Sequence, residues 1–359
     1  MSLLYTPTTL GSLVLQNRMV MAPMTRSRAT GNLPNALMAD YYAQRGTAGL
    51  IITEGASPSP NGLGYARIPG IFSAAQVEGW KATTEAVHKK GAKIFLQIMH
   101  SGRISHLLNM PSGARVIAPS AVAATGEMYT DAGGMKSLPV PEAMTLEEIN
   151  STVAEYAQAA KNAVAAGFDG IELHGANGYL LEQFIRPNSN LRTDNYGGSI
   201  ENRARFVLEV VNAVTAAIGR EKVGIRLSPF GVFNDVPLYD DMADDYTWLV
   251  QQLNLAAPAY IHIVDHSSMG APIVHDSIKA TFRNTFKGTL ILSGGYDARR
   301  AESDLAAGKG DLIAFGMGFL ANPDLVQRFK TGAALNVPDM ETLYTPGPKG
   351  YTDYPVLQE

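Results

Sequence analysis

The sequence contains no cysteine among its 359 residues. Disulfide frameworks, cysteine-ligated zinc, iron–sulfur clusters and thiol nucleophiles are therefore excluded. Charged residues are scarce at 17%, and the net charge of −4 argues against a dedicated nucleic-acid binder, which is usually basic. The chain also lacks an apolar run of about 18 residues, the length that a membrane span requires. Residues 1–18 have neither the basic nor the apolar region of a signal peptide, so we expect a cytoplasmic protein.

Apolar residues, in contrast, make up 46% of the chain, which is enough for a large core. Eight short apolar runs alternate with longer helical patterns. Most of these runs are continuous rather than alternating, which is typical of strands buried on both faces. The predicted strands are residues 18–22, 50–53, 93–98, 170–174, 223–227, 260–264, 289–292 and 311–315.

Helical patterns occupy the segments between these strands, at residues 74–90, 145–166, 199–218, 241–256 and 298–307. The second of them opens with Thr145 and Glu148 at the spacing of a capping box. Eight such strand–helix units predict an α/β fold, a (β/α)8 TIM barrel. The rival is a doubly wound sheet, which would need a glycine-rich turn after the first strand, and residues 22–26 do not provide one.

The chain is longer than a bare barrel requires, and the surplus lies mainly at residues 106–144. This segment is rich in Pro, Gly, Ser and Ala, and predicts an inserted excursion after the third strand. We find no internal repeat and no convincing linker. We therefore expect residues 1–359 to form a single barrel domain.

In a barrel of this type, function collects where the strands end. The residues at these ends are mostly polar, neutral or cationic: Thr25, Glu54, Gly55, Gln97, His100, His174, Asn177, Arg226, Asp265, His266, Gly294, Gly295 and Gly316. No lysine stands among them, which disfavours a Schiff-base aldolase. No carboxylate follows the fourth or seventh strand, which weakens a two-carboxylate glycosidase. The set suits an anionic or polar planar cofactor.

Glycines follow the last two strands, as Gly294 and Gly295 after the seventh and Gly316 after the eighth. Glycine lets backbone N–H groups approach a ligand closely, and barrels often bind phosphate at this position. These residues therefore predict a phosphate site. The alternative is that they form only tight turns.

His174, Asn177 and Tyr179 form the sharpest local cluster, directly after the fourth strand. The first two can donate hydrogen bonds to one oxygen, and Tyr179 is a weak acid with an ordinary pKa near 10. Such a set suits polarisation of a carbonyl followed by protonation of a carbon. The alternative is a satisfied polar loop with Tyr179 in the core.

Arg226 lies within the fifth strand, where a charge is costly unless it is compensated. Either an anionic ligand or a salt bridge to Glu172 would compensate it. His262 and His266 stand four residues apart in a strand, too far for one metal ion, and we expect no metal site.

Several long motifs, in order along the chain, resemble the old yellow enzyme family of FMN-dependent ene-reductases, which includes the N-ethylmaleimide, glycerol trinitrate and morphinone reductases. The likeness covers essentially the whole chain. It rests on residues 17–26, 97–103, 167–184, 192–203, 321–325 and 350–355, the longest stretch being Gly-Phe-Asp-Gly-Ile-Glu-Leu-His-Gly-Ala-Asn-Gly-Tyr-Leu-Leu-Glu-Gln-Phe.

The resemblance implies tightly but non-covalently bound FMN. It would place Thr25 at the flavin O4, Gln97 at the pyrimidine edge and Arg226 at N1 and O2. Pro23, Met24 and Gly55 would line the ring, and Gly294, Gly295, Gly316 and Met317 would surround the phosphate. His174 and Asn177 would bind the substrate oxygen, while Tyr65, Met99 and Tyr344 would flank the substrate.

The implied reaction is ping-pong. NADPH or NADH would reduce the flavin and leave. An electron-poor alkene (an α,β-unsaturated carbonyl, maleimide or nitro compound) would then accept hydride from flavin N5 while Tyr179 protonates its Cα. Two positions depart from the family pattern. Relatives usually carry Arg or Lys where this chain has Met317, and they commonly carry Trp where it has Met99.

We expect a monomer or a weak homo-oligomer.

Two other functions stay open at this point. One is a barrel hydrolase or lyase that uses His174 and Tyr179 without a cofactor. The other is a flavin binder without catalytic activity.

Overall fold

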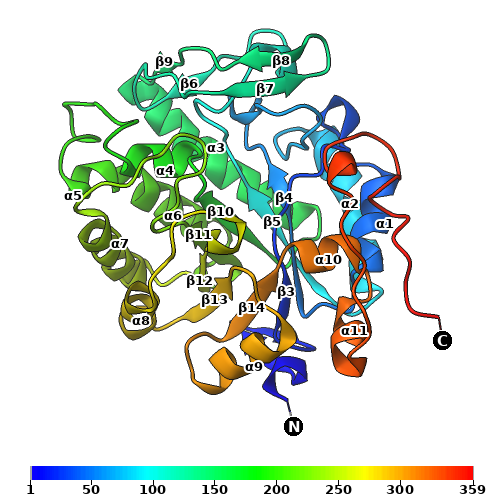
Figure 1. Ribbon diagram of the computed structural model, residues 1–359. Coiled ribbons are helices and arrows are strands. Elements are labelled where there is room, and N and C mark those ends of the chain that lie inside the picture. The colour runs from blue at the N-terminus through cyan, green and yellow to red at the C-terminus, as the bar shows by residue number, and fades with distance from the viewer. Residues whose placement is uncertain (1, 359) are drawn as a thin grey trace.

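The computed structural model describes residues 2–358, and its centre is a closed barrel of eight parallel strands (Figure 1). The strands follow one another around the barrel in chain order, and pairing of the last strand with the first closes it. Their bounds are β3 Met19–Met21, β4 Leu50–Ala56, β5 Lys93–Ile98, β10 Gly170–Gly175, β11 Val223–Leu227, β12 Tyr260–Ile263, β13 Thr289–Ser293 and β14 Leu312–Phe315. The predicted strands and the (β/α)8 fold class are confirmed.

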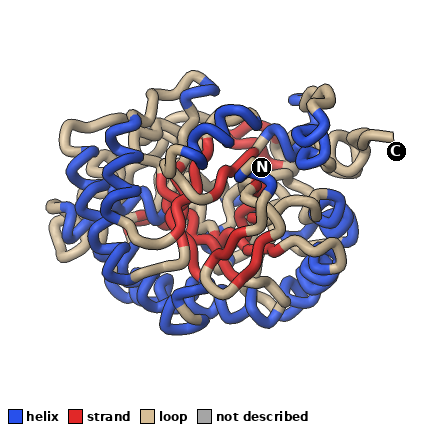
Figure 2. Tube along the Cα trace, turned by 90° about the horizontal axis from the view of Figure 1, so that it is seen from below, coloured by secondary structure: helices blue, strands red, loops and turns tan. Residues whose placement is uncertain are grey.

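Every residue of β4, β10 and β11 is buried. Figure 2 shows the reason, since the strands lie in the middle of the molecule and helices surround them. One strand face points into the barrel, where Val20, Ile52, Phe95, Tyr260 and Ile291 pack together. The other face packs against the helices, which explains why these strands are continuous apolar runs in the sequence.

Helices α2 Ala74–His88, α3 Leu146–Ala165, α7 Met242–Ala256 and α9 Ala298–Ala306 lie where the sequence predicts them. The capping box of α3 is formed, because the Thr145 hydroxyl accepts from the Glu148 N–H and the Thr145 N–H donates to the Glu148 carboxylate at 2.8 Å. No helix within residues 2–358 is both long and apolar enough to cross a membrane.

The predicted helix at 199–218 divides at Ala204 into α5 Ile200–Arg203 and α6 Arg205–Ile218, so its continuity was wrongly predicted. The break follows Arg203, whose buried guanidinium binds the Gly198 carbonyl and pairs with Asp245 of α7 at 2.6 Å. Ala204 itself keeps a helical backbone, and its N–H binds the Ile200 carbonyl at 2.8 Å, so the interruption is confined to this one residue.

Several elements were not predicted. They are the hairpin of β1 Thr8–Leu10 and β2 Leu13–Leu15, the helices α1 Ala36–Gln44, α4 Leu180–Ile185, α8 Asp276–Thr285, α10 Met317–Ala321 and α11 Leu325–Thr331, and the 3-10 helices η1 Leu3–Tyr5, η2 Thr30–Asn32, η3 Pro60–Gly62, η5 Arg220–Lys222 and η6 Ser267–Met269.

The excursion predicted at 106–144 is confirmed. It contains η4 Leu107–Asn109, the parallel pair of β6 Ile117–Ala118 with β9 Glu142–Ala143, and the antiparallel hairpin of β7 Glu127–Thr130 with β8 Gly134–Ser137. Figure 1 shows these strands as a separate layer at the top of the molecule, beyond one end of the barrel. Because the excursion follows the C-terminal end of β5, it borders the barrel end where a site is expected.

The segment after η7 Met340–Thr342 returns to the end of β3. The Arg26 guanidinium donates to the carbonyls of Leu343 (3.2 Å) and Gly350 (2.6 Å). The Arg28 guanidinium donates to the carbonyls of Thr342 (2.8 Å), Leu343 (2.6 Å) and Lys349 (2.9 Å). Two buried arginines thus hold residues 342–350 against the C-terminal end of the first barrel strand.

Candidate active site

Polar side chains form a row across the C-terminal ends of neighbouring barrel strands. Glu172 of β10 lies opposite Gln97 of β5 in the strand register. On the other side of β10, His174 lies opposite Arg226 of β11, which in turn lies opposite His262 of β12. The fold therefore brings together Gln97, His174 and Arg226, three residues that are far apart in the sequence.

The Glu172 carboxylate is fully buried and accepts hydrogen bonds from Gln97 Nε2 (2.8 Å), the Tyr260 hydroxyl (3.1 Å) and His262 Nδ1 (2.9 Å). Burial alone would raise its pKa. The interaction with His262, the positive charge of Arg226 and the hydrogen bonds from His262 and Gln97 outweigh burial, so the pKa of Glu172 lies below its ordinary value. Glu172 is therefore an anion whose oxygens are already satisfied by three hydrogen-bond partners.

Arg226 is only 6% exposed, and it forms no ion pair with any residue in the range 2–358. Its Nε atom is buried without a hydrogen-bond partner. Burial lowers the pKa of Arg226, and the charge of Glu172 opposes that effect. An arginine side chain nevertheless stays protonated in proteins. The salt bridge to Glu172 that the sequence left open is not formed, and the site holds a buried cation that a ligand anion would compensate.

The His174 ring is buried, and its Nδ1 atom has no hydrogen-bond partner. Burial and the neighbouring Arg226 charge lower the pKa of His174 well below its ordinary value. The imidazole is therefore neutral at neutral pH and carries one N–H donor. Its ring meets the Tyr179 ring edge-on, with 4.8 Å between centroids, so the two side chains border the same space.

The Tyr179 ring packs in an apolar cluster with Leu63, Met99 and Ile104, while its hydroxyl is hydrogen-bonded to the Tyr65 hydroxyl at 3.0 Å. Burial raises the pKa of Tyr179, and the hydrogen bond to Tyr65 partly opposes that rise. Tyr179 therefore keeps its proton at neutral pH. The ring thus lies in a core cluster, as one of the two sequence alternatives states, while the hydroxyl faces a polar partner.

Asn177 lies in the loop between β10 and α4, with a left-handed backbone (φ 58°) that asparagine tolerates better than most residues. Its N–H donates to the Ser228 hydroxyl at 2.9 Å, and its carbonyl accepts from the Asn234 amide at 2.8 Å. Its side-chain Oδ1 lies 3.1 Å from His266 Nε2. Ser228, Asn234 and His266 belong to later loops, so no local sequence signal pointed to them as partners.

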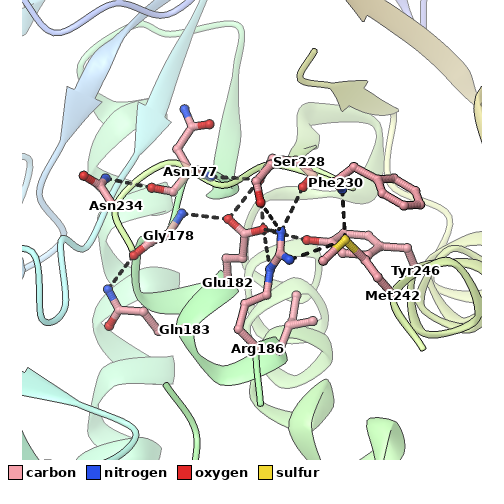
Figure 3. A network of polar contacts seen from close by, with 12 residues as sticks. Asn177, Gly178, Glu182, Gln183, Arg186, Ser228, Phe230, Asn234, Met242 and Tyr246 are labelled. Atoms are coloured by element: carbon pink, nitrogen blue, oxygen red, sulfur yellow. Dashed lines mark hydrogen bonds and ion pairs between the residues drawn. The ribbon is translucent and has the colours of Figure 1, made fainter. Parts of the chain in front are cut away.

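A buried ion pair lies beneath this loop (Figure 3). The Glu182 carboxylate accepts from Arg186 Nη2 at 2.6 Å, the Tyr246 hydroxyl at 2.7 Å and the Gly178 N–H at 2.7 Å. It also accepts from the Ser228 hydroxyl at 2.9 Å, and Ser228 in turn holds the Asn177 N–H. Removal of one partner from such a buried pair is strongly destabilising, so the loop is attached to a network that is costly to break.

The ends of β3, β4 and β14 border the same end of the barrel. Pro23 is buried, and Met24 and Thr25 are half-buried directly after β3. A Cβ atom on Gly316 would lie 3.6 Å from the Met24 sulfur, so these strand ends approach each other closely. A Cβ atom on Gly55 would lie 2.7 Å from the Met99 sulfur, and only glycine avoids that clash.

Gly294 (φ 119°) and Gly295 (φ 60°) both have backbone conformations that favour glycine, directly after β13. Gly316 precedes α10, and the first residue of that helix, Met317, is 38% exposed. The Arg300 guanidinium donates to the Gly294 carbonyl at 2.7 Å and lies over the Tyr296 ring at 4.1 Å. Arg300 therefore lies at the glycine turn.

The residues expected around the substrate also lie near Tyr179. Tyr65 and Met99 contact the Tyr179 side chain or share its apolar cluster. Tyr344 is 60% exposed on the segment that Arg26 and Arg28 hold, and it is close enough to raise the pKa of both Tyr65 and Tyr179. Tyr65, Tyr344 and Met99 thus all lie close to Tyr179.

Within residues 2–358, no three His, Asp or Glu side chains gather in a way that could hold a metal ion. His262 and His266 have separate partners, Glu172 and Asn177.

Comparison with known proteins gives consistent results along the chain. The family model described as NADH:flavin oxidoreductase / NADH oxidase matches residues 3–336. A probable flavin mononucleotide-dependent alkene reductase of Leishmania infantum is 44% identical over 98% of this chain and 96% of its own length. The 12-oxophytodienoate reductase 1 of Oryza sativa is 45% identical over 99% of this chain and 93% of its own.

Solved structures agree. Morphinone reductase superposes with a TM-score of 0.95 at 45% identity, over 99% of this chain and 96% of that one. An old yellow enzyme homologue from Zymomonas mobilis superposes with a TM-score of 0.94 at 40% identity, over 99% of both chains. With matches of this extent in sequence and structure, the chain belongs to the NADH:flavin oxidoreductase / NADH oxidase family, the FMN-dependent old yellow enzymes.

Proposed function

We propose that this chain is an NAD(P)H-dependent ene-reductase that reduces the C=C bond of α,β-unsaturated carbonyl, maleimide or nitro compounds. The observation that carries the proposal is the arrangement of three groups at one barrel end. They are the neutral donor His174, the buried cation Arg226 without an ion-pair partner, and the protonated Tyr179 with its hydroxyl on Tyr65. This set can bind an oxygen, compensate an anion and deliver a proton.

The barrel end fits FMN. The unpartnered Arg226 Nε suits an anionic ring edge, and Gln97 keeps its side-chain oxygen available because its amide nitrogen binds Glu172. Thr25, Pro23, Met24 and Gly55 would line the ring, and Gly294, Gly295, Gly316 and Met317 would lie at the phosphate, with Arg300 beside them. Bound FMN would supply the chemistry of hydride acceptance from NADPH or NADH and hydride donation to an alkene.

The remaining groups act on the substrate. His174 and the Asn177 amide would donate hydrogen bonds to the carbonyl or nitro oxygen, which withdraws electrons from the conjugated C=C bond. Tyr179 would hold its proton over Cα and release it there, and Tyr65 would stabilise the resulting phenolate by donating a hydrogen bond. Tyr344 and Met99 would set the width of the pocket.

The relatives support the substrate class. Their names include an alkene reductase and a 12-oxophytodienoate reductase, and one morphinone reductase structure holds tetrahydroNAD. We propose NADPH or NADH as the reductant on this ground. We also propose that residues 1–359 act as a single domain, because residues 342–350 are bound to the end of the first barrel strand.

The test begins with the visible absorption spectrum of the purified protein, before and after it is mixed with FMN and freed of excess. Anaerobic NADPH, or NADH in a parallel cuvette, should bleach a flavin spectrum, and 2-cyclohexenone should restore it. A protein that retains no flavin in either preparation would overturn the proposal. A flavin that is bleached but never reoxidised by any of the three substrate types would instead indicate a flavin binder without ene-reductase activity.

A further inference from the structure

The side-chain amide of Asn177 has a single hydrogen-bonding partner within residues 2–358, the imidazole of His266. The main chain of Asn177 is fixed on both sides, by Ser228 at its N–H and by Asn234 at its carbonyl. Figure 3 shows that the amide points away from the Glu182–Arg186 pair, so that network holds the backbone and leaves the amide free. The orientation of the amide therefore depends on the 3.1 Å contact between Oδ1 and His266 Nε2.

His266 is well placed to hold this amide. It lies just beyond β12, at the same barrel end as His174 and Arg226. It is close to both, because Arg226 lowers the pKa of His266 and His266 lowers that of His174. Its neighbour Asp265 is buried and anchored by Lys279 at 2.7 Å and by the Ser267 N–H at 3.0 Å. The centroid of the Phe233 ring lies 6.2 Å from that of the imidazole, with the two rings tilted by 47°.

The protonation of His266 is consistent with a donor role. Burial, followed by the charge of Arg226, lowers its pKa to about 4, while Asp265 and Glu182 act in the opposite direction. At neutral pH the ring therefore carries a single N–H. With that proton on Nε2, His266 donates to Oδ1 and leaves both N–H bonds of the Asn177 Nδ2 atom for a substrate oxygen.

We infer that His266 is a positioning residue, which fixes the Asn177 amide so that its N–H groups face the substrate. The inference rests on the proposed function, because it assigns the oxygen-binding role to Asn177. His266 lies 89 positions away in the chain and outside the motifs that identify the family.

The test is a double-mutant cycle on the FMN-loaded protein with 2-cyclohexenone as substrate. His266→Ala should raise KM roughly 3–10-fold, the effect of one lost hydrogen bond, with a smaller change in kcat. His266→Gln, whose amide can still donate, should recover most of that loss. In an Asn177→Ala background, His266→Ala should have no further effect on KM, because the group it positions is gone.

His275→Ala is the matched control, since His275 lies in the same region, is exposed and contacts the Phe230 ring rather than Asn177. Its KM should match that of the unmodified protein. Flavin content and the melting temperature are recorded for every variant, so that a folding defect is recognised. If His266→Ala impairs folding, His266→Phe, which keeps an aromatic ring but has no N–H to donate, takes its place in the cycle.

Additive effects of His266→Ala and Asn177→Ala on KM would overturn the inference while leaving the ene-reductase proposal intact. An unchanged KM in His266→Ala would do the same. Absence of 2-cyclohexenone reduction in the unmodified, flavin-loaded protein would count against the proposed function itself, so the two failures are distinguishable.

Discussion

The hydroxyl oxygens of Tyr179 and Tyr65 lie 3.0 Å apart, although the two residues follow different barrel strands and stand 114 positions apart in the chain. The contact makes the two phenols unequal. The hydrogen bond lowers the pKa of Tyr179, whereas it raises the pKa of Tyr65 further above its ordinary value after burial has raised it. Tyr179 is therefore the better acid of the two, and Tyr65 is the group that stabilises its anion.

Tyr179→Phe should slow alkene reduction by about 100-fold or more, which is typical for loss of a general acid. Bleaching of the flavin by NADPH should change little, because that step needs no proton from Tyr179. Stopped-flow absorbance of the two half-reactions measures both rates. Tyr65→Phe should give a smaller loss in the alkene step only. If both half-reactions slowed together in Tyr179→Phe, the proton-donor assignment would be wrong.

Arg226→Met should weaken flavin binding, because it removes the buried cation that compensates an anionic ring edge. We expect the Kd to rise roughly 10–100-fold, as for loss of a hydrogen bond to a charged group. Titration of flavin fluorescence measures the Kd for FMN and for riboflavin. Both ligands should lose affinity equally, since Arg226 lies on the barrel wall rather than at the glycine turn. An unaltered Kd for both would contradict this role.

Met317→Arg should strengthen the binding of FMN but not that of riboflavin. An arginine at this exposed first position of α10 would add a charge-assisted bond to the phosphate. We expect FMN to bind roughly 10-fold or more tightly, with riboflavin unchanged. Arg300→Ala should weaken FMN binding, because Arg300 lies at Gly294.

Lys309→Ala is the matched control for this pair. Lys309 is bound to Asp304 at 3.0 Å, so its loss should leave the Kd for FMN unaltered. A Kd that responded to Lys309→Ala but not to Arg300→Ala would show that the phosphate lies elsewhere.

Glu54 should make the protein less stable as pH rises from acid to neutral. It is fully buried, and burial raises its pKa from 4.5 to about 7 despite the neighbouring Arg26 and Tyr42. The stabilising contribution of its neutral form is complete below pH 4.5 and is lost as pH rises through about 7. Relative to Glu54→Gln, the free energy of unfolding should fall by about 3 kcal/mol across this window.

Urea unfolding of the unmodified protein and of the Glu54→Gln variant at a series of pH values measures this difference. Other groups also titrate, such as His100, because burial lowers the pKa of His100 to about 3. They titrate in both proteins, so their contributions to the free energy of unfolding cancel in the comparison. Parallel pH profiles for the two proteins would show that Glu54 is already ionised in the folded state.

The barrel could be predicted from the sequence because parallel strands that are buried on both faces are continuous apolar runs. Strand β4 extends three residues beyond its predicted end at Thr53, through Glu54 and Gly55, residues that are rare in strands. Glu54 is accommodated there by the Tyr42 hydroxyl and the Arg26 N–H, which no local pattern reveals. Helix α1 was missed because it buries tyrosines rather than presenting an aliphatic stripe.

The candidate site was predictable where its residues share a motif, as His174, Asn177 and Tyr179 do. It was also predictable at strand ends, where the fold class alone brings Gln97 and Arg226 to the same edge. The supporting contacts were not predictable, because they join distant loops. Ser228 and Asn234 follow β11, yet they hold the backbone of Asn177, which stands 51 and 57 positions earlier in the chain.

The anchoring of residues 342–350 by Arg26 and Arg28 has a consequence for how the protein is made. These guanidinium groups bind carbonyls that lie 314–324 positions later in the chain. During synthesis on the ribosome, both arginines must therefore remain hydrated or bound elsewhere until those carbonyls emerge. The segment that carries Tyr344 is then the last part of the candidate site to assemble, and a nascent chain that stops short of residue 342 lacks it.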